Sequence, residues 1–255
     1  MDKNYYFSDF TEDNYKRLLG IALERYEFID FDFKYINGSD DRRLLWRHDV
    51  DYSLNRAAVL SEIEHKVGVR ATYFIHLHSP MYTPFEKQQY DLIKKIIKNE
   101  HNIGLHFDFD FYKDFEKTNR FSDAVEAAVY EKEMLQNLFN INVDCVSFHT
   151  PEASGVLDID EDYFAGMVNA YAKSIKEKFK YCSDSNGYWR FDRLEDVLNG
   201  NYSNIQVLTH PVWWTKEVLT PFDRVVRCVD GRRNRCIVDY NNFLDECGRE
   251  NVGKK

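Results

Sequence analysis

Short apolar runs alternate with helix-like segments along most of this chain, and this alternation limits the possible folds more than any other feature. Residues 44–46 form the first apolar run, and a helix with one apolar face follows from Ser53 until Gly68 stops it. Strands that alternate with helices pair in parallel and carry the helices outside, so the expected class is α/β. Further strands are predicted at 71–75, 103–107, 143–148, 179–183 and 205–209, and further helices around 93–97, 122–139 and 163–175.

The chain is expected to form one domain. Its 255 residues suit a single α/β barrel, and neither an internal repeat nor a Pro/Gly/Ser-rich linker divides them. Residues 1–40 are predicted to form a helical lead-in that is capped near Thr11, and residues 215–255 a C-terminal extension packed on the barrel. Hydrophobic residues make up 44% of the chain, which is enough for a sizeable core and excludes intrinsic disorder.

Charge and cysteine usage narrow the partners. The net charge of −9 repels a phosphate backbone, so nucleic acid is excluded as a partner, and the short basic stretch at 232–235 is interpreted as a solvated turn. Five cysteines without a C-x-x-C pair indicate free thiols in a reducing compartment. The chain shows neither a leader pattern nor a run of about 18 apolar residues, so a cytoplasmic protein without a membrane span is expected. The oligomeric state stays open.

Polar side chains collect where the predicted strands end. Asp49 and Asp51 follow the first strand, Asp108 and Asp110 the third, and Asp184 the fifth. In parallel α/β folds the carboxyl ends of the strands meet at one rim, which is where such folds build active sites. Six of the eight histidines also lie at these ends: His48, His76, His78, His106, His149 and His210.

Carboxylates and imidazoles at one rim are the ligands of a zinc-like divalent ion. A bound ion lowers the pKa of water toward ~7 and polarises a carbonyl group, so hydrolysis becomes possible at neutral pH. A free carboxylate can then accept the proton of the water, and an imidazolium can protonate the leaving group. The predicted cofactor is one divalent metal ion, zinc first, with nickel, cobalt or manganese as alternatives.

Five motifs in this order resemble the polysaccharide deacetylases, also called carbohydrate esterase family 4 or the NodB-homology group. The resemblance spans about residues 44–214 and is stronger to a divergent branch whose first motif reads His-Asp-Val-Asp. It implies a distorted, seven-stranded (β/α) barrel, one metal held by an Asp and two His, an Asp as catalytic base and a His as catalytic acid. The motifs lie at 45–51, 71–74, 101–106, 147–151 and 208–211.

The motifs at 45–51 and 101–106 suggest the base and the metal ligands. Carried over by position, Asp49 is the base and Asp51 a metal ligand, although the intervening Val50 leaves an exchange of these roles open. His106 matches a ligand histidine. The second ligand histidine of the family is replaced by Asp110, with Asp108 as the competing alternative. Both choices supply a carboxylate oxygen that can bind the same ion.

The later motifs suggest the acid and the substrate contacts. His210 matches the acid histidine of the family, and Asp184 is expected to orient it. His149 stands where the family has an Arg that orients the base, so it could complete the metal shell or contact the substrate. The residues expected to line the substrate site or to support these groups are His48, His149, Pro151, Trp189, Arg190 and Trp213.

The resemblance and the residues together predict a metal-dependent hydrolase of a carbon–nitrogen bond. The expected reaction removes an acyl group from a sugar or a sugar precursor in polysaccharide metabolism, so the partner is a small-molecule or carbohydrate substrate. Two alternatives remain. One is a hydrolase of a non-carbohydrate amide, of the allantoinase or formamide type. The other is a catalytically silent domain that binds a glycan or a protein. It is supported by two substitutions, of the second ligand histidine of the family and of the family's Arg at the position of His149.

Overall fold

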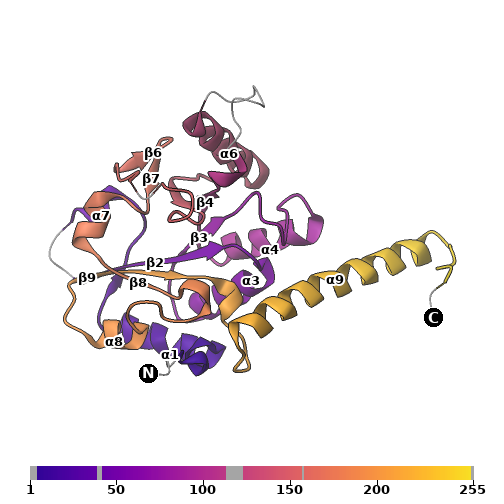
Figure 1. Ribbon diagram of the computed structural model, residues 1–255, viewed down its shortest axis with the longest axis horizontal. Coiled ribbons are helices and arrows are strands. Elements are labelled where there is room, and N and C mark those ends of the chain that lie inside the picture. Colours follow the sequence, from indigo (N-terminus) through magenta and orange to yellow (C-terminus); the bar gives the residue numbers. More distant parts are fainter. Residues whose placement is uncertain (1–4, 39–41, 113–122, 157, 254–255) are drawn as a thin grey trace.

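The computed structural model describes residues 5–38, 42–112, 123–156 and 158–253, and these build one sheet with helices on its outer side (Figure 1). The order of the nine described strands is β6-β7-β5-β4-β3-β2-β9-β8, with β1 paired to the start of β2. Among them only β6 and β7 pair antiparallel. The strands are β1 (Glu27–Phe28), β2 (Arg43–Val50), β3 (Thr72–Ile75), β4 (Asn102–Phe107), β5 (Cys145–Phe148), β6 (Tyr163–Phe164), β7 (Met167–Asn169), β8 (Lys180–Ser183) and β9 (Asn204–Thr209).

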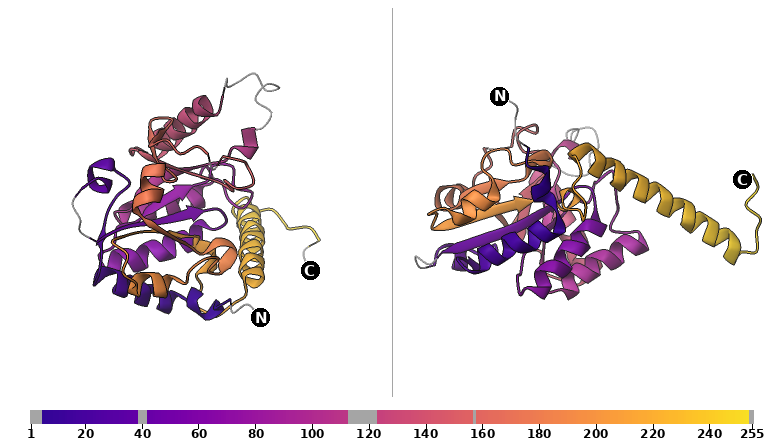
Figure 2. Two further views of the ribbon diagram at one scale, coloured as in Figure 1. Left: turned by 60° about the vertical axis from the view of Figure 1, so that its left-hand side comes forward. Right: turned by 90° about the horizontal axis from the view of Figure 1, so that it is seen from below.

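The sheet curls into a half-barrel, which confirms the predicted class of parallel strands with outer helices (Figure 2). Two predicted helix starts are also confirmed, because the side chain of Thr11 accepts from the Asn14 amide and that of Ser53 from the Arg56 amide. The helices are α1 (Glu12–Leu23), α2 (Phe33–Ile36), α3 (Leu54–Lys66), α4 (Lys87–Lys98), α6 (Ala124–Phe139), α7 (Lys173–Lys178), α8 (Leu194–Asn199) and α9 (Pro221–Glu246), with short 3-10 turns at η1 (Phe7–Phe10), η2 (Asp110–Tyr112), η3 (Ser185–Gly187) and η4 (Pro211–Trp213).

The central strand β2 is buried along its whole length and separates two apolar clusters. Trp46 belongs to the cluster beneath the outer helices, whereas Leu45 packs with Phe74 in the cluster inside the half-barrel. Successive side chains on a strand point to opposite faces. Arg47 and Asp49 therefore share the inner face with Leu45, and this places two charged groups at the floor of the half-barrel.

The helix predicted for residues 163–175 is wrong in its first half. Residues 163–169 form the β6–β7 hairpin, and only Lys173–Lys178 is helical. The two turn residues, Ala165 and Gly166, have φ values of 51° and 71°. Two consecutive residues with positive φ make the tight turn that suits a two-residue hairpin, and this conformation ends any helix.

The C-terminal extension does not pack on the barrel as predicted, except near its start. Helix α9 projects from the body as a long arm (Figure 1), and Arg224 and Leu244 are the buried residues among its 26. Phe222 and Phe243 are 74% and 54% exposed. Most of the other large apolar side chains of this helix are also exposed, so they do not pack on the body. None of the described helices is long and apolar enough to cross a membrane.

Candidate metal centre and active site

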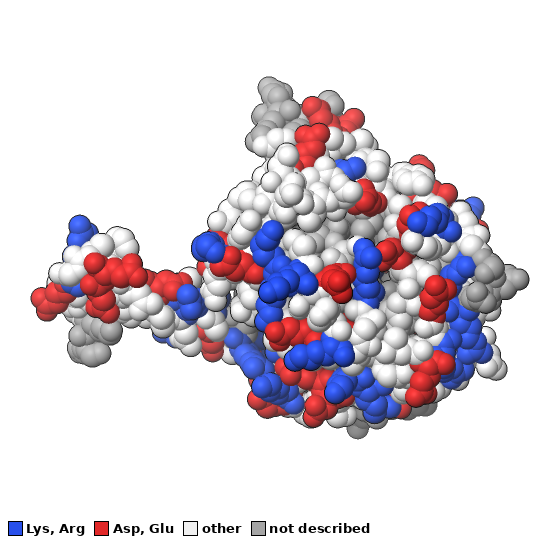
Figure 3. Space-filling view, turned by 180° about the vertical axis from the view of Figure 1, so that it is seen from behind, with Lys and Arg blue, Asp and Glu red and all other residues white. Residues whose placement is uncertain are grey.

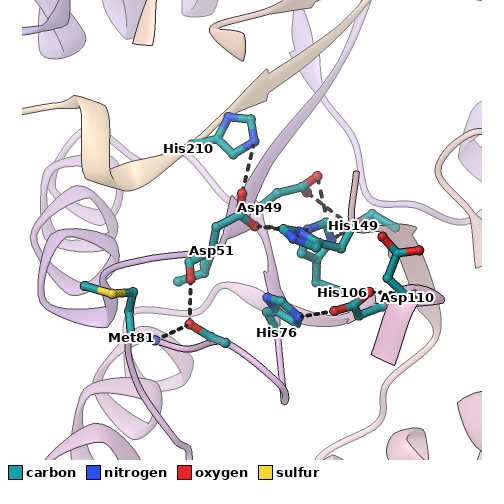
Figure 4. Close-up of polar contacts among 12 residues, drawn as sticks. Asp49, Asp51, His76, Met81, His106, Asp110, His149 and His210 are labelled. Atoms are coloured by element: carbon teal, nitrogen blue, oxygen red, sulfur yellow. Dashed lines mark hydrogen bonds and ion pairs between the residues drawn. The ribbon is translucent and has the colours of Figure 1, made fainter. Parts of the chain in front are cut away.

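The carboxyl ends of the strands meet around one cavity of about 890 Å³. Its lining includes Asp49 and Asp51 from β2 and the turn after it, His106 from β4, His149 after β5 and His210 after β9. These residues point toward one another although up to 161 positions separate them in the sequence (Figure 4). The gathering of acidic and imidazole groups that the strand ends predicted is therefore present.

Three ligand atoms converge at the floor of this cavity. Asp51 Oδ1 lies 3.0 Å from His106 Nε2 and 3.6 Å from His149 Nδ1, and the two imidazole nitrogens are 3.3 Å apart. Ligand atoms at roughly 2.0–2.2 Å around a tetrahedral ion lie about 3.3–3.6 Å from one another. The donor set and its spacing fit a divalent metal ion with a fourth position open to the cavity, so Asp51, His106 and His149 form a candidate metal group.

The backbone around Asp51 is held in place by the loop that follows β3. Ser79 Oγ donates to the Asp51 carbonyl at 2.6 Å, and Tyr82 Oη donates to the Val50 carbonyl at 2.6 Å. Burial raises the pKa of the Asp51 carboxyl, but the hydrogen bonds from His106 and His149 have the larger, opposite effect. The pKa of Asp51 therefore lies well below its usual value. Asp51 is therefore an ionised carboxylate, the form that binds a cation.

Asp49 lies outside this group and contacts different neighbours. Ser147 Oγ donates to Asp49 Oδ1 at 3.2 Å and lies 2.6 Å from His106 Nδ1, so a hydroxyl connects the carboxylate to the imidazole. Arg47 Nη2 faces Asp49 Oδ2 at 3.4 Å, and both side chains are almost fully buried. Sequence reasoning missed Arg47 and Ser147. The available signal was an Arg inside a buried strand, two residues before an Asp and on the same face.

His210 pairs with Asp184 as predicted. Its Nδ1 lies 2.6 Å from Asp184 Oδ1, and the backbone amide of His210 donates to both oxygens of that carboxylate. Trp214 Nε1 also donates to Asp184 at 3.2 Å. Burial lowers the pKa of His210, but the Asp184 carboxylate outweighs it and brings the pKa to about 9. The other nitrogen, Nε2, faces Asp51 Oδ2 at 3.7 Å, so this imidazolium stands beside the metal group.

The two carboxylates proposed as the second ligand are not part of the first group. Asp108 instead faces His76, with 3.4 Å between Oδ2 and Nε2, and forms a second candidate group with His76 and His149. Asp110 belongs to neither group of ligand atoms that the described residues form. Its backbone amide donates to Asp108 Oδ1 at 2.9 Å and tightens the turn after β4. The sequence predicted His76 only as one of the histidines at the strand ends, in a supporting or packing role.

The remaining expected site residues divide into two sets. Pro151, Arg190 and Trp213 line the cavity, and Arg190 makes an ion pair with Glu152, another lining residue, at 3.1 Å. The described lining does not include Trp189, whose Nε1 donates to Asp9 at 2.8 Å.

His48 also lies away from the cavity, because it points to the outer face of β2. Its Nε2 lies 2.6 Å from Glu64 and its Nδ1 2.5 Å from Thr209 Oγ1. His78 likewise pairs with Glu131, at 2.7 Å. Both imidazoles serve the surrounding structure rather than the metal group.

No family model matches the chain, and the search of curated proteins returns no match. The search of solved structures returns a family 4 carbohydrate esterase from Bacillus anthracis, at 14% identity, 85% coverage of both chains and a TM-score of 0.41. A chitin deacetylase from Colletotrichum lindemuthianum follows at 14% identity, 74% and 81% coverage and 0.37. A family 4 pseudoenzyme from Bacillus anthracis has 13% identity, 76% and 62% coverage and 0.39. The chain is thus similar to solved members of carbohydrate esterase family 4, the family that its motifs resemble.

Proposed function

We propose that this protein is a metal-dependent hydrolase that removes an acyl group from the nitrogen of a sugar or a sugar precursor in polysaccharide metabolism. The observation that carries the proposal is the convergence of Asp51 Oδ1, His106 Nε2 and His149 Nδ1 on one point at the cavity floor. The His210–Asp184 pair lies beside that point, and Asp49 is a further lining carboxylate. A base, an acid and a cation site in one cavity are the set that amide hydrolysis needs.

Asp51, His106 and His149 would hold the ion. When bound, the ion would make water acidic enough to ionise near neutral pH and would polarise the acyl oxygen of the substrate. The chain contributes the orientation of these ligands: Ser147 fixes the His106 ring through Nδ1, and the loop after β3 fixes the Asp51 backbone. Such supporting contacts raise metal affinity because the ligands are ordered before the ion arrives.

Asp49 and His210 would move the protons. Asp49 lines the cavity outside the metal group, close to His106, and it would accept the proton that the attacking water loses. His210 would donate its proton to the departing nitrogen as the carbon–nitrogen bond breaks, which releases a free amine and a carboxylate. Asp184 keeps His210 protonated at neutral pH and fixes which nitrogen faces the cavity.

The walls of the cavity support a sugar as the substrate. Aromatic rings alternate with charged and polar groups there, and this combination suits sugar rings, which have apolar faces and polar edges. On the face drawn in Figure 3, Lys and Arg side chains lie among Asp and Glu, with no continuous patch of one sign. The aromatic residues of the lining are Tyr52, Phe148, Tyr171, Phe179, Tyr181, Phe191 and Trp213.

The test is an acetate-release assay on N-acetylated sugars, run beside formyl and ureido compounds. We expect release that requires added zinc, cobalt, nickel or manganese and that falls at least about a hundredfold in Asp51→Asn and His149→Ala. His65→Ala is the matched control, because His65 is half exposed and outside both candidate groups. Release from formyl or ureido compounds alone would move the substrate away from sugars. Retention of full activity in His149→Ala would contradict the metal group itself.

A further inference from the structure

His76 is a buried imidazole whose environment is incomplete. Its side chain is 2% exposed, and within the described part of the chain neither ring nitrogen has a hydrogen-bond partner. Asp108 Oδ2 faces Nε2 at 3.4 Å without the alignment of a hydrogen bond. A buried polar atom without a partner is costly and uncommon in folded proteins, and binding a metal ion is one way to satisfy such a nitrogen.

The groups around His76 are those of a cation site. One ligand atom each from His76, Asp108 and His149 lie within 4.8 Å of one another, and the rings of the two histidines are 4.4 Å apart. The backbone holds two of them: Tyr82 Oη accepts from the His76 amide at 3.0 Å, and Asp108 Oδ1 accepts from the Asp110 amide at 2.9 Å. The second oxygen of Asp108 is thereby directed at His76.

We propose that His76, Asp108 and His149 bind a second divalent cation, next to the one held by Asp51, His106 and His149. Two imidazoles and one carboxylate favour zinc, cobalt, nickel or manganese over calcium and magnesium, which prefer oxygen ligands alone. His149 is common to both groups. Two ions that share one imidazole take one ring nitrogen each, so His149 would release its remaining ring proton to solvent and would bridge the two ions as an imidazolate.

The second cation has a different role from the first. His76 and Asp108 are absent from the described lining of the cavity, whereas His149 is part of it. The second cation therefore lies behind His149 and does not reach the substrate. It binds the ring nitrogen of His149 that the first cation does not use, and this fixes the orientation of the ring. The affinity of the first group for its own cation is raised as a result. The inference needs no hydrolysis, so it stands or falls apart from the proposed function.

The experiment is cobalt(II) titration of the full chain after chelation, followed by ligand-field absorption and by elemental analysis of the dialysed protein. We expect two cobalt ions per wild-type chain. Asp108→Asn keeps the Oδ1 acceptor and the shape of Asp108, and we expect it to bind one ion, with an affinity weakened about tenfold. His76→Gln is expected to behave in the same way. The control His65→Ala is expected to bind two.

Three results would overturn the inference. They are one ion per wild-type chain at saturation, two ions in Asp108→Asn, or a loss of both ions in that variant without a change in its fold by circular dichroism. Asp51→Asn gives the reciprocal arm, because it removes a ligand of the first group alone and is expected to retain the ion at His76. Two bound ions without acetate release would leave this inference standing and contradict the proposed hydrolysis.

Discussion

Asp49 and Asp51 are two residues apart at the end of β2, and their neighbours give them different chemistry. Asp51 faces two imidazoles and can share a cation with them, whereas Asp49 faces a guanidinium and a hydroxyl. The spacing put both carboxylates on one side of the chain. Arg47 of the same strand distinguishes Asp49, but the imidazoles that face Asp51 and the hydroxyl that faces Asp49 come from β4 and from β5 and the turn after it. The first motif by itself therefore leaves the two roles open.

The His210–Asp184 pair predicts the alkaline limb of the pH profile. The pKa of His210 is raised to about 9, so the acid form is present below that pH and is lost as the pH rises through it. Asp184→Asn removes the main cause of the increase. We expect the alkaline limb of kcat/KM to move down by about one pH unit or more. The exposed Asp192→Asn is the control, and an unmoved limb in Asp184→Asn would contradict the assigned acid.

The Arg47–Asp49 pair predicts a strong effect on stability. Arg47→Met removes one charge of a buried pair and leaves the Asp49 carboxylate without its counter-ion. We expect a loss of about 3–5 kcal/mol in the free energy of unfolding, measured by urea denaturation. The double variant with Asp49→Asn should recover part of that loss. A change below about 1 kcal/mol in Arg47→Met would contradict a stabilising role for this buried ion pair.

At the scale of single elements, close packing between β3 and β4 explains why a glycine, Gly104, stands in the motif at 101–106. A Cβ placed on Gly104 would lie 2.5 Å from the Phe74 ring and 3.0 Å from Cys145 Sγ. Gly104→Ala should therefore lose about 1–3 kcal/mol through overpacking, measured by thermal unfolding. Gly231→Ala is the opposite case, because nothing lies within 4 Å of that position in α9. It should be neutral or slightly stabilising.

Helix α9 predicts an uneven pattern of amide hydrogen exchange. Its first turns are tied to the body by Arg224, which donates to the Phe7 carbonyl, and by the Arg232–Glu86 ion pair. Beyond that point Ile237, Val238 and Tyr240 are about half exposed. We expect the amides after Arg232 to exchange nearly as fast as those of a free helix, whereas β2 exchanges slowly. Equal protection along α9 would indicate a partner on the distal half.

The sequence predicted the elements that carry strong local signals. The caps at Thr11 and Ser53 and the apolar runs of β2, β3, β4 and β9 were found within a few residues. The hairpin around Gly166 was missed because it is short and its apolar residues also fit a helical period. The sequence left open whether His149 completes the metal shell or contacts the substrate, because its ring meets His106 only after β5 pairs with β4.

At the scale of the whole molecule, the half-barrel places the site at its centre and a long arm at its edge. The cavity is lined by the turns after the strands and also by three lysines, Lys176 and Lys178 of α7 and Lys180 of β8. They lie on the side of the half-barrel where the described strands β7 and β8 do not pair with each other, which leaves a gap. Gln206 partly bridges this gap by donating to the Ala170 carbonyl at 2.8 Å. The cavity is therefore open along one side of the fold.

The ion pair between Arg190 and Glu152 joins two loops that line this cavity, one after β5 and one after η3. Both side chains are about half exposed, so the pair contributes no more than about 1 kcal/mol and opens readily. A bulky substrate can separate the two loops at little cost in free energy. Dissolved salt weakens the ion pair in advance, because it screens the two charges. Under the proposed function, hydrolysis of long sugar chains should thus increase at moderate salt, whereas hydrolysis of single sugars should not change.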